Sequence, residues 1–273
     1  MAKQNSLPPP LPSPQGGGRV TQGIALASSL EERTINTIER PWGAEARFEP
    51  SPRWVRVRFG NALVADSKRV MLLLEPKKLG IYYFPQDDVR MDLLTRAGER
   101  LWTVKVGDRV AERAAWEREA YPGYIAFKWD LMDAWFEEDD EVWVHPRDPY
   151  HRVDVVTSSR HVQVVVDGVT AADTHRPHLL FETGLPTRYY IPKLDIRMDL
   201  LTPTATQTRC PYKGKAIYWS VKVGDRDYPD IVWSYSPPIP ECTRIDNLLA
   251  FYNEKVDLIV DGEKLPKPKT PWS

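Results

Sequence analysis

The chain has 273 residues, a formal net charge of −1 and charges of both signs mixed along its length, without a basic stripe. This balance argues against a nucleic-acid partner. The sequence contains no run of about 18 apolar residues, so no membrane span is predicted. The two cysteines are too far apart for a disulfide framework or a zinc motif, so we expect a cytoplasmic protein with no metal or cofactor.

The first 38 residues are rich in proline and glycine and contain no apolar stretch typical of a secretory signal. Such a composition cannot form a packed core, which predicts a disordered tail over residues 1–38. The ordered part is expected to begin near Arg40–Gly43. The segment Pro8–Pro10 could alternatively bind a partner protein.

An internal repeat organises the rest of the chain. Val89–Leu94 recurs 107 residues later as Ile196–Leu201, and Glu75 and Glu182 are separated by the same offset. Copies of this length are ordinary for a single domain. The expected domains are 39–148 and 149–265, followed by a tail over 266–273.

Each copy contains short stretches in which apolar and polar side chains alternate, a pattern typical of half-exposed strands. The stretch 161–166 ends in Asp167-Gly168, a type I′ hairpin signal, and its counterpart is Trp54–Phe59. Helix signals are confined to one or two turns near Trp129 and Cys242, the latter reaching Leu248-Leu249. Further strands are predicted at 70–74, 82–84, 102–106, 179–181, 189–191, 219–223 and 256–260. We therefore predict an all-β chain in which each copy is a small antiparallel barrel or a bent two-sheet unit.

The two copies differ by two insertions in the second. The offset rises from 107 to 117 before Trp219, a gain of 10 residues, and to 124 before Ala250, a gain of 7 more. Cys210 lies in the first inserted segment and Cys242 in the second. Because loops on a rigid β scaffold often carry function, we expect the working site in the second copy.

Cys210 is the candidate reactive group, since Arg209 and Lys213 place positive charge near its thiol and would favour the thiolate. Cys210 and Lys213 are therefore the candidate catalytic residues. The alternative is a small buried cysteine beside a proline turn, with Lys213 in solvent.

Aromatic and charged residues near the insertions could form a ligand pocket. The alternatives are core packing for the aromatic residues, a cross-strand ion pair for Arg197, a structural anchor for Glu182 and a surface turn for Asn253 and Glu254. The candidate ligand-binding residues are Glu182, Arg188, Tyr190, Arg197, Tyr212, Tyr218, Trp233, Tyr252, Asn253 and Glu254.

The histidines cluster around a predicted linker at residues 145–150 and in the early second copy. His175 and His178 are too close in sequence to indicate a metal site on their own. We therefore expect the histidines to lie in solvent-exposed loops.

An ordered series of motifs, including Leu180–Tyr190, Arg197–Leu201, Cys210–Gly214, Ala250–Glu254 and Val260–Glu263, resembles the bacterial domain of unknown function 427 (DUF427) in a tandem form. The resemblance covers residues 40–263 and implies a fold similar to the β-tent (Mss4-like) group. That group often carries a zinc held by two Cys-x-x-Cys pairs, which this sequence lacks. The family also has a nucleotidyltransferase-like label, but no Gly-Ser followed by an Asp-x-Asp pair supports it here.

Two hypotheses follow for function. In the first, the second copy binds a small polar or aromatic ligand in a pocket, and in its stronger form Cys210 gives this pocket catalytic capacity. In the second, the chain is a structural or protein-interaction module without catalysis. The sequence predicts neither a nucleic-acid nor a membrane partner.

Overall fold

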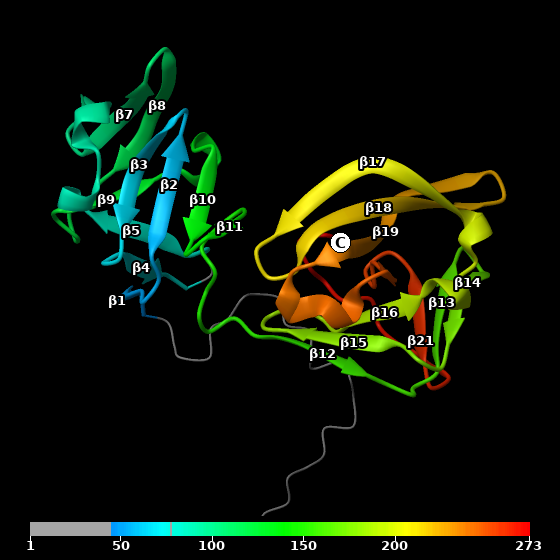
Figure 1. Ribbon diagram of the computed structural model, residues 1–273. Coiled ribbons are helices and arrows are strands. Elements are labelled where there is room, and N and C mark those ends of the chain that lie inside the picture. The colour runs from blue at the N-terminus through cyan, green and yellow to red at the C-terminus, as the bar shows by residue number, and fades with distance from the viewer. Residues whose placement is uncertain (1–44, 77) are drawn as a thin grey trace, which may run out of the picture. The chain divides into compact units, whose positions relative to one another are not determined.

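The computed structural model describes residues 45–76 and 78–273. The expectations for the first 38 residues and for Arg40–Gly43 lie outside these ranges. Within them the chain is all-β with two similar halves and little helix, as the alternating patterns predicted (Figure 1). The sheets are antiparallel and open at both edges, so each half is a bent two-sheet unit rather than a closed barrel.

In the first repeat, a seven-stranded sheet has the order β1-β4-β5-β9-β8-β7-β6 and a four-stranded sheet has the order β11-β10-β2-β3. The strands are β1 (Arg47–Pro50), β2 (Val55–Phe59), β3 (Ala62–Ser67), β4 (Met71–Leu74), β5 (Ile81–Pro85), β6 (Leu94–Gly98), β7 (Leu101–Val106), β8 (Arg109–Trp116), β9 (Tyr124–Phe127), β10 (Ala134–Glu137) and β11 (Asp140–Val142).

The second repeat has the same arrangement, with the orders β12-β15-β16-β20-β19-β18-β17 and β14-β13-β21-β22. Each strand of the larger sheet thus has a counterpart at the same place in the first repeat. The strands are β12 (Val153–Thr157), β13 (Val162–Val166), β14 (Val169–Thr174), β15 (His178–Glu182), β16 (Arg188–Pro192), β17 (Leu201–Cys210), β18 (Gly214–Val223), β19 (Arg226–Pro238), β20 (Leu248–Phe251), β21 (Asp257–Val260) and β22 (Glu263–Lys264).

All helices in the described ranges are 3-10 turns, and none has the length and apolar character needed to span a bilayer. Leu248 and Leu249, predicted to continue a helical turn, instead begin β20, because the preceding turn ends at Ile245. The turns are η2 (Gln86–Asp88), η3 (Met91–Leu93), η4 (Trp129–Leu131), η5 (Lys193–Asp195), η6 (Met198–Leu200) and η7 (Pro240–Ile245).

The hairpin between β13 and β14 has the predicted turn. Asp167 and Gly168 both have positive φ angles, +48° and +79°, as a type I′ turn requires. In β2, alternate side chains Val55, Val57 and Phe59 are buried, which confirms the period-two reading. These turns and alternations fix which face of each strand points inward.

The larger sheet of the second repeat buries residues on both faces. One face packs on the smaller sheet through side chains such as Leu179, Ile191 and Leu249. The opposite face, carrying Leu180 and Tyr190, forms a separate apolar cluster with the residues of β18, β19 and η7. Phe181, in the strand predicted at 179–181, is 44% exposed, because it points away from this cluster.

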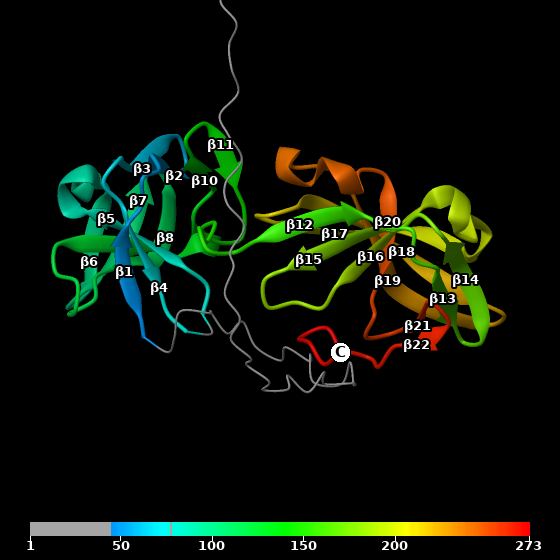
Figure 2. The same ribbon diagram turned by 90° about the horizontal axis from the view of Figure 1, so that it is seen from below.

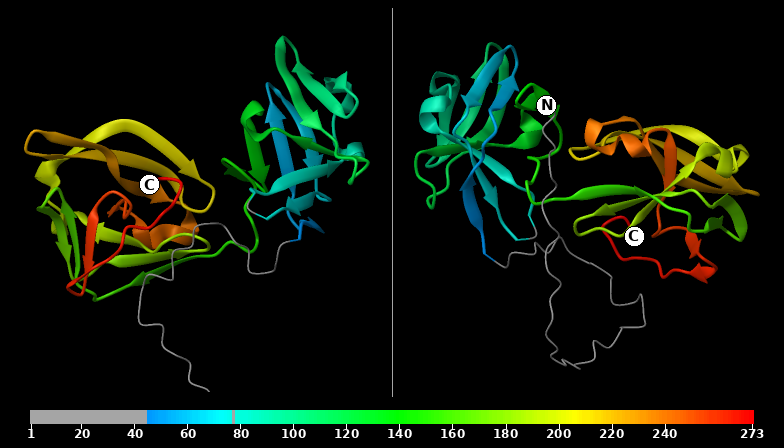
Figure 3. Two further views of the ribbon diagram at one scale, coloured as in Figure 1. Left: turned by 180° about the vertical axis from the view of Figure 1, so that it is seen from behind. Right: turned by 60° about the horizontal axis from the view of Figure 1, so that its bottom comes forward.

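The larger sheet of the second repeat is strongly bent. Figures 1 and 3 show β17 and β18 arching over β12 and β15, with η7 beside the arch. Seen from below in Figure 2, β12, β15 and β16 form the floor of this arch. The concave face therefore belongs to the second repeat's larger sheet, on the side away from the smaller sheet.

Candidate functional site

The first insertion lengthens a hairpin rather than forming a loop. Strands β17 and β18 have 10 residues each, whereas β6 and β7 have 5 and 6. Cys210 and Gly214 form the last pair before the turn. Gly214 has φ +110°, and a Cβ there would lie 3.2 Å from the backbone nitrogen of Ile239, so only glycine fits without a shift.

The second insertion contributes the end of β19 and the turn η7, and it packs directly on the first. The backbone N–H of Ile239 donates to the carbonyl of Lys213 at 3.0 Å. The thiol of Cys242 donates to the carbonyl of Tyr212 at 3.2 Å. Cys242 and Ile245 are buried, 1% and 0% exposed, beneath this contact. The two inserted segments thus form one unit at the end of the arch.

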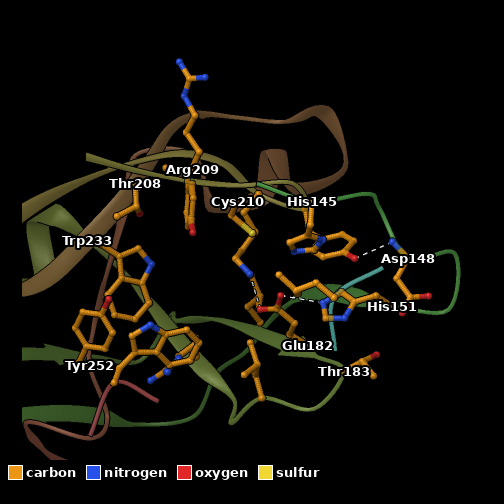
Figure 4. A pocket seen from close by; sticks show the side chains of 18 of the residues that line it. His145, Asp148, His151, Glu182, Thr183, Thr208, Arg209, Cys210, Trp233 and Tyr252 are labelled. Atoms are coloured by element: carbon orange, nitrogen blue, oxygen red, sulfur yellow. Dashed lines mark hydrogen bonds and ion pairs between the residues drawn. The ribbon is translucent and has the colours of Figure 1, made fainter. Parts of the chain in front are cut away.

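A cavity of about 450 Å³ lies under the arch (Figure 4). Nine of the twelve candidate residues line it, namely Glu182, Arg188, Tyr190, Cys210, Tyr212, Lys213, Tyr218, Trp233 and Tyr252. These residues come from β15, β16, β17, β18, β19, the turn between β17 and β18, and the segment after β20. Segments far apart in the sequence are therefore brought around one space.

A buried ion pair stands at one end of the cavity. The ammonium of Lys213 donates to Glu182 Oε2 at 2.5 Å, and Glu182 Oε1 is 3.0 Å from His151 Nε2. The side chains of Glu182 and Lys213 are only 5% and 10% exposed. Burial alone would raise the pKa of Glu182, but the attraction of the Lys213 ammonium and the hydrogen bonds from His151 and Lys213 lower it to about 2.

Lys213 is a fixed cation in this arrangement. Burial alone would lower its pKa, but the neighbouring Glu182 carboxylate outweighs this effect and raises the pKa above that of an ordinary lysine. Lys213 can therefore donate hydrogen bonds into the cavity, but at neutral pH it carries no free lone pair with which to accept a proton. The alternative reading, with Lys213 in solvent, is wrong because the residue is 8% exposed.

Tyr212 links the inserted hairpin to the linker. Its ring stacks on His151, with centroids 4.1 Å apart, and its hydroxyl accepts a hydrogen bond from the backbone N–H of Asp148 at 2.8 Å. Burial raises the pKa of the Tyr212 hydroxyl, so it stays neutral. Figure 4 shows His151 and Glu182 joined by a dashed line, close to the bond that reaches Asp148.

The other end of the cavity is aromatic. The rings of Trp233 and Tyr252 lie 4.6 Å apart, and the indole N–H of Trp233 donates to the Tyr190 hydroxyl at 3.1 Å. The hydroxyls of Thr208 and Tyr218 are hydrogen-bonded at 2.8 Å. In Figure 4, Trp233 and Tyr252 lie across the cavity from Glu182. One end is thus charged and the other apolar.

Arg188 sits behind this aromatic end. Its guanidinium donates two hydrogen bonds to Glu254, both at 2.7 Å, and the two side chains are 7% and 0% exposed. The guanidinium also lies 5.5 Å from the Trp233 ring centroid. Burial would raise the pKa of Glu254, but hydrogen bonds from Arg188 and Thr270 hold it below its ordinary value.

Three candidate residues do not line the cavity. Arg197 forms an exposed ion pair with Asp199 at 2.6 Å, which is a local contact at the turn η6 rather than the cross-strand pair of the alternative. Asn253 is buried and donates to the carbonyl of Thr187 at 2.9 Å, and Glu254 is buried by Arg188, so neither forms the surface turn that was the alternative.

Several lining residues were not predicted. His145 and His151 line the cavity and are partly buried, so the expectation of solvated histidines is wrong for these two. Burial lowers the pKa of His145. His145 and His151 reach the cavity because the linker passes beside Glu182. No residue spacing in the sequence indicates the path of this linker. Tyr235 and Trp272 also line the cavity, and Arg209 extends away from the other labelled side chains in Figure 4.

The first repeat fills the equivalent face with aromatic side chains. Tyr83 and Trp116 correspond to Tyr190 and Trp233, and there the ring of Phe48 stacks on Tyr121 at 3.9 Å while Tyr83 packs edge-on against Phe48. The first repeat also has no counterpart of Cys210. The buried pair of Glu182 with Lys213 is thus a feature of the second repeat, because Lys213 lies in the first insertion.

Native alkylation is expected to distinguish the two free thiols. Burial raises the pKa of Cys242 from 9.0 to about 11, which lowers its thiolate fraction about 100-fold, and the residue is 1% exposed. Iodoacetamide should therefore modify Cys210 and spare Cys242, as measured by peptide mass spectrometry over time. Equal rates for the two thiols would show that Cys210 is not accessible from the cavity.

Comparison with known proteins identifies both repeats. The family model described as a domain of unknown function (DUF427) matches residues 47–138 and 154–262. No curated protein matches the chain significantly. The two matched ranges coincide with the two halves that share one strand order.

Proposed function

The chain belongs to the DUF427 family in a tandem form, and from this premise we propose that its second repeat binds a small ligand in the cavity under the arch. One observation carries the proposal: the first insertion, supported by the second, covers a space with a charged end and an aromatic end. Concave sites of this kind, with few polar groups on an apolar lining, are typical of small-molecule binding.

The lining indicates the chemistry of the ligand. Lys213 makes one hydrogen bond within the described residues, to Glu182, and an ammonium has three donors. Its remaining donors suit an acceptor oxygen such as a carboxylate or carbonyl. Trp233 and Tyr252 offer ring faces to a flat group. We therefore propose a small molecule that combines an aromatic ring with an acceptor oxygen.

Cys210 gives the proposal its stronger, catalytic form. The side chain is half-buried and lines the cavity beside Lys213. A thiol in that place can contact the bound ligand and, as a thiolate, add to a carbonyl carbon while the π electron pair of the C=O bond moves onto the oxygen. Lys213 would act there as a hydrogen-bond donor to developing negative charge, because it is already protonated. A Cys210 sealed in a packed core would have favoured the alternative, an interaction module, and the adjoining cavity argues against that.

Binding can be tested by thermal shift with a panel of small aromatic carboxylates and amides. A compound that binds only the folded state stabilises it by about 2.7 kcal/mol at 100 times its Kd. Filling the cavity with Cys210→Phe should abolish the shift for any hit. Tyr252→Leu removes the half-buried ring without filling the space and should weaken the same hit.

Arg197→Ala supplies the matched control, since Arg197 was a candidate from the sequence but lies in an exposed ion pair. Its thermal shift should equal that of the wild type. A hit that shifts Cys210→Phe as much as the wild type binds elsewhere, and the cavity would then lose its proposed role.

Two finer assignments accompany this proposal. The bend of the larger sheet supports the β-tent relationship that the motifs implied. Two free cysteines, one of them facing a cavity, suit a reducing compartment such as the cytoplasm.

A further inference from the structure

A second cluster of chemically active side chains lies on the hairpin β13–β14, among residues that do not line the cavity. Val162 pairs with Thr174 and Gln163 with Asp173, so His161 and His175 continue the register as the next opposed pair. Asp173 lies two residues before His175 and therefore points to the same face. Two imidazoles and a carboxylate thus share one face at the edge of the hairpin.

The three side chains already converge. One ligand atom from each, chosen from the imidazole nitrogens and carboxylate oxygens, lies within 4.8 Å of the other two. The two imidazole rings stack with centroids 4.1 Å apart and planes 12° from parallel. His161 Nε2 is 2.8 Å from Asp173 Oδ1, while Asp173 Oδ2 accepts a hydrogen bond from Gln163 at 2.8 Å. The side chains of His161 and Asp173 are 32% and 50% exposed, so an ion has access from solvent.

The first repeat shows that the hairpin does not need these histidines. At the equivalent positions, Trp54 donates its indole N–H to Asp66 at 2.6 Å, and the Lys68 ammonium lies 4.8 Å from the Trp54 ring centroid. In the first repeat, an indole ring, a carboxylate and an ammonium group therefore make the contact that two imidazoles and a carboxylate make in the second. Only the second repeat has replaced the ring and the cation with two imidazoles, which can both bind a metal.

We propose that His161, Asp173 and His175 form a binding site for a first-row divalent cation such as Zn²⁺, with the remaining coordination positions open to water or to a partner's ligand. Imidazole nitrogens suit zinc, copper and nickel, and a single carboxylate completes a three-ligand set. Because the ligand atoms are this close, rotation of the two imidazole rings out of their stack would bring all three to about 2.1 Å from one ion. Gln163 would keep its bond to the second carboxylate oxygen and orient the ligand.

The sequence-based expectation of no metal rested on the two separated cysteines and on the short spacing of His175 and His178. His178 is not part of the cluster, because it belongs to β15 on the larger sheet. The partner of His175 is His161, 14 residues earlier and across the hairpin. Cross-strand neighbours of this kind are visible only once the register is known.

The test uses the full chain and isothermal titration with ZnCl₂, supported by the visible absorption of bound Co²⁺. The wild type should bind one equivalent. The double variant His161→Trp/His175→Lys installs the first repeat's residues, so it should keep the fold, as checked by circular dichroism. Its affinity should fall by more than about 100-fold, beyond the loss that an outer-shell change causes.

The reciprocal variant Trp54→His/Lys68→His places the same ligand set on the first repeat around Asp66 and should add a second equivalent of bound metal. No binding by the wild type would overturn the proposal. So would an equivalent that persists in the His161→Trp/His175→Lys variant, since the ion would then be held by other side chains.

Discussion

Replacing Arg188 with methionine is expected to destabilise the second repeat by about 3–5 kcal/mol. The substitution leaves the Glu254 carboxylate, whose side chain is 0% exposed, without the two hydrogen bonds and the opposite charge that hold it. Methionine has a similar volume, so the loss is electrostatic rather than a packing defect. Hydrogen exchange on peptides from residues 154–262 measures the effect locally.

Two controls separate the buried pair from a general effect of removing charge. The double variant Arg188→Met/Glu254→Leu removes both charges and should recover much of the lost stability, because buried pairs are often replaceable by apolar groups. Arg197→Ala breaks an exposed pair and should cost at most about 1 kcal/mol. A loss below about 1 kcal/mol in Arg188→Met would contradict the buried-pair account.

Acidification is expected to remove about 3 kcal/mol of stability through Glu182 alone. The pKa of this carboxyl is lowered from 4.5 to about 2 in the folded protein, so the folded state favours the ionised form. Its contribution is fully present above pH 4.5 and is lost as the pH falls towards 2. The wild type and Glu182→Gln should therefore differ most at neutral pH and converge in acid.

The measurement is the free energy of unfolding in urea at a series of pH values, again followed in the second repeat. Glu75 provides the comparison at the twin position in the first repeat. It also has a lowered pKa, chiefly through a hydrogen bond from Arg118, but its side chain is 17% exposed. The stability difference between the wild type and Glu75→Gln should depend less steeply on pH. If the stability differences for Glu182→Gln and Glu75→Gln had equal slopes against pH, burial of the Glu182–Lys213 pair would contribute nothing to stability.

The strands were predictable because their signals are local. Alternation along Trp54–Phe59 and the Asp167-Gly168 turn depend only on neighbouring residues, and the structure confirms both. Because the two halves are similar in sequence, a strand predicted in one half also predicts a strand at the matching positions of the other. The motifs also indicated the family correctly.

The cavity was only partly predictable. The insertions indicated Cys210 and Lys213 as candidates. The changed spacing between the two repeats could not show, however, that the first insertion extends the hairpin of β17 and β18. His151 reaches Glu182 through the linker, 31 residues away, and Arg188 reaches Glu254 across 66 residues. The first pair arises because β12 lies beside β15 and the second because β16 lies beside β20, and no periodicity along the chain encodes these placements.

The contact between the two inserted segments has a consequence for the ancestry of the second repeat. Ile239 and Cys242 take their hydrogen-bond acceptors from the turn at Tyr212 and Lys213, and Gly214 is shaped to let that backbone come close. Deleting either segment would leave hydrogen-bonding groups of the other segment without their partners in an apolar environment. Relatives that carry one insertion are therefore expected to carry both, gained or lost as a single evolutionary step.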